Sequence, residues 1–141
     1  MCLKKGMFFI MLKEFIFCFL ILIIILFGNN QTQNYTKESV KNISEQLTQL
    51  RQNLINKDDK IDEEKAKSEM ENVEKEWENR HDKLAYFIEH DELEKVETNI
   101  TALKSYIETK KYEESISELD KAEFLLKHIQ DKYAFNLENI F

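Results

Sequence analysis

The sequence predicts an all-α protein, in which an N-terminal transmembrane or signal-anchor helix precedes an antiparallel bundle of about four helices. Three observations lead to this prediction. The 141 residues include no proline and only two glycines, which excludes folds that need glycine-rich turns or phosphate-binding loops. Residues 15–27 are all apolar. From residue 40 onward, apolar residues recur at steps of three and four, the spacing of one face of a helix.

Residues 1–28 are predicted to form a signal anchor. As a helix, the run FIFCFLILIIILF at residues 15–27 would be about 20 Å long, shorter than the hydrocarbon core of about 30 Å, whereas residues 7–27 are long enough to cross the lipid bilayer. Lys13 and Glu14 would then lie near one interface, where charged side chains are tolerated. The side chains expected to contact lipid include Phe15, Phe19, Leu22, Ile25 and Phe27.

The distribution of positive charge predicts the orientation of this anchor. Lys4, Lys5 and Lys13 precede the apolar run, and the next basic residue is Lys37. The positive-inside rule therefore predicts a single-pass protein of the cell membrane, with a cytoplasmic N-terminus and residues 29–141 extracytoplasmic. Secretion after signal-peptide cleavage is the alternative, but only Gly28 offers a small residue at the end of the run. Translation could also start at Met7 or Met11.

A polar segment, residues 29–36, is expected to be a membrane-proximal linker, and residues 37–130 are expected to form the bundle. The first helix of the bundle should be capped by Thr36 or Ser39 and should end near residue 56, and Asp58 or Asp59 should start the next helix. Its apolar stripe is Val40, Ile43, Leu47, Leu50 and Leu54.

Two further stripes predict the second and third helices. The second consists of Ala66, Met70, Val73, Trp77, Leu84, Phe87 and Ile88, and the third of Leu93, Val96, Ile100, Leu103 and Ile107. Asp91 and Glu94 have the spacing of a helix-capping pair, so a kink or tight turn is expected at residues 89–91. The alternative is one long helix over residues 62–109.

The last helix follows a break at residues 109–111. Its stripe is Tyr112, Ile116, Leu119, Glu123, Leu126 and Ile129, with Phe124 and Leu125 widening the apolar face. The apolar tail, residues 131–141, is expected to dock on the bundle. Short connections predict an up-and-down bundle or two stacked helical hairpins. Core anchors are expected at Trp77, Leu84, Ile100, Leu103 and Leu126.

Charge and composition restrict the partners and the chemistry. Residues 28–141 carry 26 acidic and 17 basic side chains, so this part should repel nucleic acid and anionic lipid. Both cysteines precede residue 28, which excludes a disulfide framework in the bundle. No arrangement typical of a catalytic triad and no cofactor motif is present, so we expect no enzyme, no catalytic residue and no cofactor.

One segment could bind a cation. His90, Asp91 and Glu94 lie within one and a half helical turns, and imidazole and carboxylate groups are common metal ligands. The structural interpretation of the same residues is an acidic helix N-terminus, which needs no metal. His81 and His128 carry the same ambiguity between a structural and a ligand-binding role.

Several segments resemble a known but uncharacterised family. These are Trp77, the segment YFIEHDELEKVETNI at residues 86–100, FLLKHI at residues 124–129 and NLENIF at residues 136–141. Together they resemble a family of short, N-terminally membrane-anchored proteins of low-GC Gram-positive bacteria, mainly clostridial, that carries a domain of unknown function. The resemblance covers most of residues 65–141. It implies no activity, but members are often encoded near a small multi-spanning membrane protein.

Two functions fit these features. The first is a non-enzymatic membrane protein whose acidic extracytoplasmic bundle binds another membrane or envelope protein, with residues 7–27 in the bilayer. The second is an extracytoplasmic sensor or binding module for a cation or small ligand around His90, Asp91 and Glu94.

Overall fold

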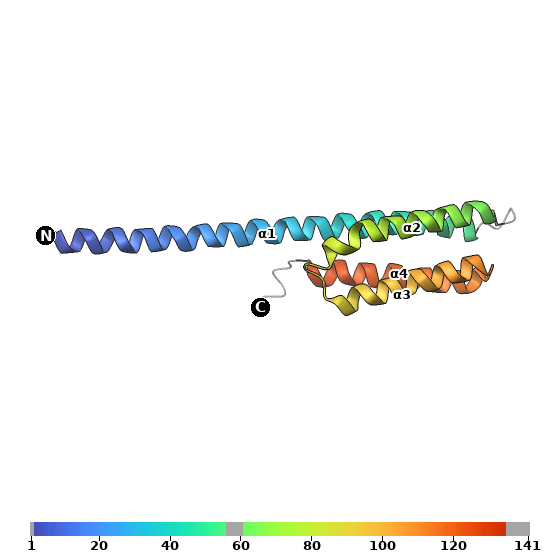
Figure 1. Ribbon diagram of the computed structural model, residues 1–141. Helices are drawn as coiled ribbons and strands as arrows, with labels where there is room; N and C mark the ends of the chain where they lie inside the picture. The colour runs from blue at the N-terminus through green and yellow to red at the C-terminus, as the bar shows by residue number, and fades with distance from the viewer. Residues whose placement is uncertain (1, 56–60, 135–141) are drawn as a thin grey trace. The chain divides into compact units, whose positions relative to one another are not determined.

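The computed structural model describes residues 2–55 and 61–134 and consists of helices joined by short connections (Figure 1). The helices are α1 (Cys2–Ile55), α2 (Glu63–Leu84), α3 (His90–Glu108) and α4 (Tyr112–Tyr133). Across these described ranges no residue lies in a strand, which confirms the all-α class. The chain divides into two units, Met1–Asn34 and Tyr35–Phe141.

The first unit contains the apolar part of α1. Every side chain from residue 12 to residue 28 is exposed, and Phe15 reaches 73% exposure. The helix is long enough and apolar enough to cross a membrane, with a mean hydropathy of 2.2 in its most apolar window, as an anchor or a signal sequence would be. All five residues expected to contact lipid are among the exposed apolar residues of this unit.

α1 does not break where a linker was expected. Residues 29–36 are helical, and the Thr32 hydroxyl donates a hydrogen bond to the Gly28 carbonyl oxygen at 2.9 Å. The prediction that Thr36 or Ser39 caps a new helix is therefore wrong, because both residues lie inside α1. The boundary between the two units still falls within this segment, between Asn34 and Tyr35.

In the second unit, polar contacts show that neighbouring helices run antiparallel. Arg80, late in α2, pairs with Glu38, early in the bundle part of α1, at 3.3 Å. At the other end of this hairpin, the Asn53 amide donates a hydrogen bond to the Asp62 carbonyl oxygen at 3.1 Å. Lys110, after α3, pairs with Glu63, at the start of α2, at 2.7 Å.

Two further contacts place α4. Lys132, at its end, pairs with Glu92, at the start of α3, at 3.0 Å. Arg51 of α1 pairs with Glu123 of α4 at 3.1 Å. The helices after Asn34 therefore form an up-and-down four-helix bundle, which can also be described as two hairpins, α1–α2 and α3–α4.

One apolar stripe from each helix forms the core. The expected core anchors Trp77, Leu84, Ile100, Leu103 and Leu126 are all less than 5% exposed. The whole buried set is Val40, Ile43, Leu47, Leu50, Leu54, Ala66, Met70, Val73, Trp77, Leu84, Ile88, Leu93, Val96, Ile100, Leu103, Ile107, Leu119, Ala122, Leu126 and Ile129. The steps of three and four thus identified the buried face of each helix.

The helix ends differ from the sequence predictions. α2 starts at Glu63, where the Asp62 carboxylate accepts the Lys65 amide hydrogen at 3.0 Å; Asp58 and Asp59, which were expected to start this helix, lie outside the described residues. α2 ends at Leu84, which excludes one helix over residues 62–109. α3 begins at His90, with Glu89 as its N-cap residue.

Asp91 therefore lies in the first turn of α3 instead of capping it, and the turn occupies residues 85–89, earlier than expected. Tertiary contacts explain the shift. Ile88 is buried in the core, and the Tyr133 hydroxyl accepts the Glu89 amide hydrogen at 3.0 Å, which satisfies a backbone group at the start of the helix.

α4 also differs from its predicted stripe. Phe124 is 69% exposed, so it does not widen the buried face. Glu123 is half-buried in ion-pair contact with Arg51, and Ala122 occupies the core position beside it. The tail, residues 131–141, was expected to dock on the bundle. Of this tail, residues 135–141 lie outside the described residues.

Candidate functional site

The start of α3 holds the residues that the sequence indicated as metal ligands. Carboxylate oxygens of Glu89, Asp91 and Glu92 lie within 4.8 Å of one another. His90 and Glu94 do not belong to this group, so of the three residues expected to bind a cation only Asp91 does. Glu89 and Glu92 lie in the same segment, which is rich in potential ligands, but they were not among the three expected ligands, because their approach depends on where the helix begins.

Lysine side chains already pair with all three carboxylates. Lys132 of α4 contacts Glu92 at 3.0 Å and Glu89 at 3.1 Å, and these two hydrogen bonds raise the pKa of Lys132. Lys95 contacts Asp91 at 3.1 Å, and this hydrogen bond lowers the pKa of Asp91. We call these five residues the α3–α4 clasp. A cation would have to displace both lysines from it.

The three histidines are placed separately. His81 is half-buried, and its ring centroid lies 5.4 Å from that of Trp77. His128 is exposed and stacks on Phe124, with centroids 6.5 Å apart and planes inclined by 14°. His90 is exposed at the start of α3. Over residues 2–55 and 61–134, no histidine joins a group of three ligand atoms close enough to hold a metal.

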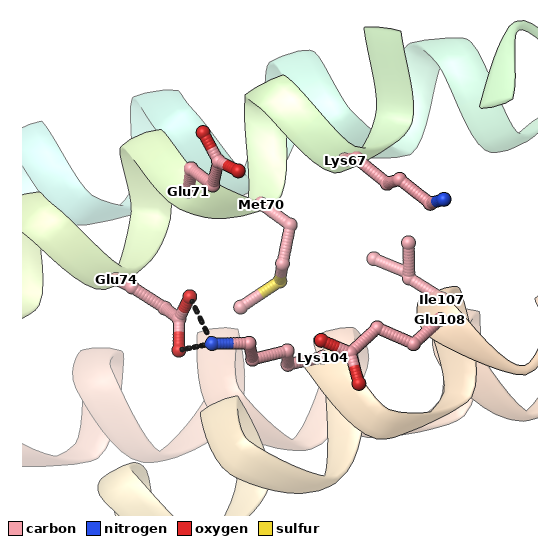
Figure 2. Close-up of a pocket in the computed structure, with 7 residues that line it drawn as sticks. All are labelled: Lys67, Met70, Glu71, Glu74, Lys104, Ile107 and Glu108. Atoms are coloured by element: carbon pink, nitrogen blue, oxygen red, sulfur yellow. Dashed lines mark hydrogen bonds and ion pairs between the residues drawn. The ribbon is translucent and has the colours of Figure 1, made fainter. Parts of the chain in front are cut away.

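A pocket of about 290 Å³ lies between α2 and α3 (Figure 2). Met70 points from α2 toward α3, and Met70 and Ile107 form an apolar floor, each only 2% exposed. Glu74 of α2 and Lys104 of α3 form an ion pair of 2.9 Å at one side. Lys67, Glu71 and Glu108 complete the lining.

Two other hollows lie along α4. A groove of about 780 Å³ between α1 and α4 is lined by Val40 and by polar and charged side chains that include Lys37, Lys41 and Lys127. A shallow pocket of about 360 Å³ contains the exposed ring of Phe124, with Leu125 beside it. Among the described residues of the second unit, Tyr86, which is 88% exposed, and Phe124 are the most exposed large apolar residues.

Comparison with protein families gives one match. A model of a domain of unknown function, DUF4363, matches residues 31–140, which include the bundle part of α1 and all of α2, α3 and α4. The chain belongs to the DUF4363 family. No curated protein and no solved structure matches it.

The residues of this DUF4363 chain that match the family model lie mainly in the bundle. The match extends to residue 31, well before residue 65, where the resemblance seen in the sequence begins. The family description assigns no activity. The surface of the bundle and the apolar segment that precedes it are therefore the features that bear on function.

Proposed function

We propose that this DUF4363 protein is a non-enzymatic single-pass membrane protein whose extracytoplasmic bundle binds another membrane or envelope protein. The observation that carries the proposal is that residues 15–27, thirteen consecutive apolar side chains, are all exposed. Leaving apolar surface in water costs about 25 cal/mol per Å², so this segment needs an apolar environment, and its length with residues 7–14 suits a bilayer.

Support for the orientation comes from charge. Lys4, Lys5 and Lys13 lie on one side of the apolar segment, and the bundle with its acidic excess lies on the other. The positive-inside rule then favours a cytoplasmic N-terminus. We propose the cell membrane as the location, with a secreted bundle as the alternative if the anchor is cleaved.

A protein partner is supported by the surface of the bundle. Tyr86 and Phe124 are large aromatic side chains that lie exposed on a turn and on α4, respectively. Aromatic side chains contribute strongly to protein interfaces. The resemblance described above adds a partner class, a small multi-spanning membrane protein, in bacteria of the low-GC Gram-positive group.

The experiment is recovery of the full-length, C-terminally tagged protein from membranes in mild detergent. We expect one protein to co-purify in stoichiometric amount. A matched variant, Leu103→Asp, places a charge in the core of the bundle and leaves the anchor unchanged. We expect this variant to remain in the membrane but to recover no partner, because its bundle is disrupted. Recovery of the wild-type protein alone would overturn the proposal of a protein-binding function.

The anchor has its own test. Leu22→Arg combined with Ile25→Arg puts two charges into the apolar segment, and each costs about 3 kcal/mol at the centre of a membrane helix. We expect the wild-type protein to resist alkaline extraction and the double variant to be released. A bundle that starts after Gly28 and is found in the soluble fraction would instead support a cleaved signal peptide.

A second candidate is a cation-binding module at the start of α3, which the approach of Glu89, Asp91 and Glu92 favours. A ligand that binds only the folded state raises the melting temperature. We would measure the unfolding of the bundle by the fluorescence of Trp77, the single tryptophan, with and without Ca²⁺, Mg²⁺ and Zn²⁺. Because Lys95 and Lys132 pair with these carboxylates, we expect no shift; a rise that Asp91→Asn abolishes would favour this candidate.

A further inference from the structure

We propose that the pocket between α2 and α3 binds a lysine or arginine side chain of the partner protein. This inference depends on the proposed function, because it names the site on the bundle and the chemistry of the partner that fits it. Three features of the pocket favour this ligand: its floor, its charges and the way those charges are already paired.

The floor suits the aliphatic part of a basic side chain. Met70 and Ile107 lie at the bottom of the pocket, so a few methylene groups placed over them inside the pocket would lose contact with water. The volume of about 290 Å³ admits a single side chain rather than a helix or a strand. The flexible thioether of Met70 can adjust to stems of different shape.

The charged lining carries one negative charge in excess, because Glu74 pairs with Lys104 and Lys67 can offset only one of the two remaining carboxylates. Three carboxylates and two ammonium groups line the pocket. Glu74 and Lys104 pair with each other, and Glu71 and Glu108 both lie near enough to raise the pKa of Lys104. Neither Glu71 nor Glu108 forms an ion pair within the described part of the chain. An incoming ammonium or guanidinium group would gain an interaction with carboxylates on both helices.

The whole domain favours the same class of partner. Residues 28–141 carry 26 acidic against 17 basic side chains, so a basic segment is attracted to the bundle before it finds the pocket. The α3–α4 clasp is a weaker candidate for binding a basic side chain, because Lys95 and Lys132 already pair with its carboxylates.

The first test needs no identified partner. Full-length protein in detergent micelles, labelled at the methyl groups of methionine and isoleucine, is titrated with N-acetyl-lysine methylamide, a lysine side chain without backbone charges. We expect the Met70 and Ile107 methyl signals to shift. N-acetyl-norleucine methylamide, which has a similar stem without the charge, should shift them much less at the same concentration. Equal shifts with both compounds, or none with either, would overturn the proposal.

Variants then assign the effect to the carboxylates. Glu71→Gln with Glu108→Gln should weaken the binding of the lysine compound by at least about fivefold, as expected for two exposed charge interactions. Glu78→Gln with Glu97→Gln changes the same charge on exposed positions of the same helices outside the pocket, and should leave the binding unchanged. If both double variants weaken binding equally, a general effect of charge is responsible and the proposal is wrong.

The last arm uses the co-purified complex. The Glu71→Gln, Glu108→Gln protein should recover at least about fivefold less partner than the Glu78→Gln, Glu97→Gln protein. If both recover the partner equally, the pocket does not bind the partner, although a protein-binding function would stand. If the wild-type protein recovers no partner, the proposed function itself fails, and a shift with the lysine compound would then indicate a site for free alkylammonium ions.

Discussion

The Arg51 guanidinium of α1 donates a hydrogen bond of 3.1 Å to the Glu123 carboxylate of α4, across 72 positions of sequence. It also pairs with Asp120, one turn earlier on α4. Burial works against the charge of Arg51, but the contacts with Asp120 and Glu123 outweigh it and raise the pKa of Arg51. These contacts join the first helix of the bundle to the last.

The first prediction concerns this contact. Arg51→Met keeps much of the aliphatic stem and removes the charge, so we expect the free energy of unfolding of the bundle to fall by about 1 kcal/mol. Guanidinium unfolding followed by Trp77 fluorescence measures this loss. The matched control is Lys121→Met, because the one ion pair of Lys121 among the described residues is with Glu118, within α4 itself. Equal stability of both variants would contradict a role for Arg51 in joining α1 to α4.

The second prediction concerns the pH dependence of the α3–α4 clasp. Contacts with Glu92 and Glu89 raise the pKa of Lys132 above the ordinary value of 10.5. The stabilisation is therefore complete below pH 10.5 and is lost as the pH rises through the higher pKa of the folded state. We expect wild type to melt at a higher temperature than Lys132→Met at pH 7, and the difference to shrink above pH 10.5.

Two controls sharpen this measurement. Lys127→Met changes an exposed lysine of α4 that has no ion pair within the described residues, so its difference from wild type should be small at every pH. The contributions of Lys104 and Lys110, whose pKa values are also raised, cancel in the comparison of wild type with Lys132→Met. A difference that stays constant up to pH 12 would contradict the assignment.

The sequence predicted the buried faces better than the helix ends. Residues such as Leu103 and Leu126 lie on the one continuously apolar face of their helix. This face is buried whichever helix packs against it, so the spacing alone predicts the burial of both residues. Phe124 illustrates the limit of the same argument. It lies beside Leu125 and Leu126 in the sequence, but its direction from the helix axis places it in solvent.

The candidate site was less predictable, because contacts between helices create it. Asp91 looked like a capping residue from its spacing to Glu94, but the buried Ile88 and the Tyr133 hydroxyl fix the turn before Glu89. For the α2–α3 pocket, the sequence offered one indication, the high density of lysine and glutamate after residue 63. Nothing in the sequence paired Glu74 with Lys104, 30 positions away.

The third prediction concerns the turn between α3 and α4. Lys110 has a φ of 59°, a left-handed conformation that favours glycine, and follows the end of α3. The amides of Lys110 and Lys111 donate to the carbonyl oxygens of Ile107 and Tyr106, the pattern of a Schellman motif. Lys110→Gly should therefore be more stable than Lys110→Ala by about 1 kcal/mol.

The comparison of these two variants removes the contribution of the Lys110 ion pair. Both lose the ion pair of Lys110 with Glu63, so their difference reports the backbone conformation alone. Guanidinium unfolding followed by Trp77 fluorescence again gives the free energies. An alanine variant as stable as the glycine variant would show that the turn of the folded protein does not hold residue 110 in the left-handed region.

The fourth prediction concerns Ser39, which is fully buried in α1. Its Oγ has no hydrogen-bond partner in the part of the chain that the structure describes, whereas the buried Ser115 hydroxyl of α4 donates to the Lys111 carbonyl oxygen at 2.9 Å. A buried hydroxyl without a partner costs about 1–3 kcal/mol, so Ser39→Ala should leave the bundle equally stable or more stable. Ser115→Ala should instead destabilise it by about 1 kcal/mol, because a hydrogen bond is lost. If Ser39→Ala destabilises the bundle as much as Ser115→Ala, the Ser39 hydroxyl has a partner in solution, such as a buried water.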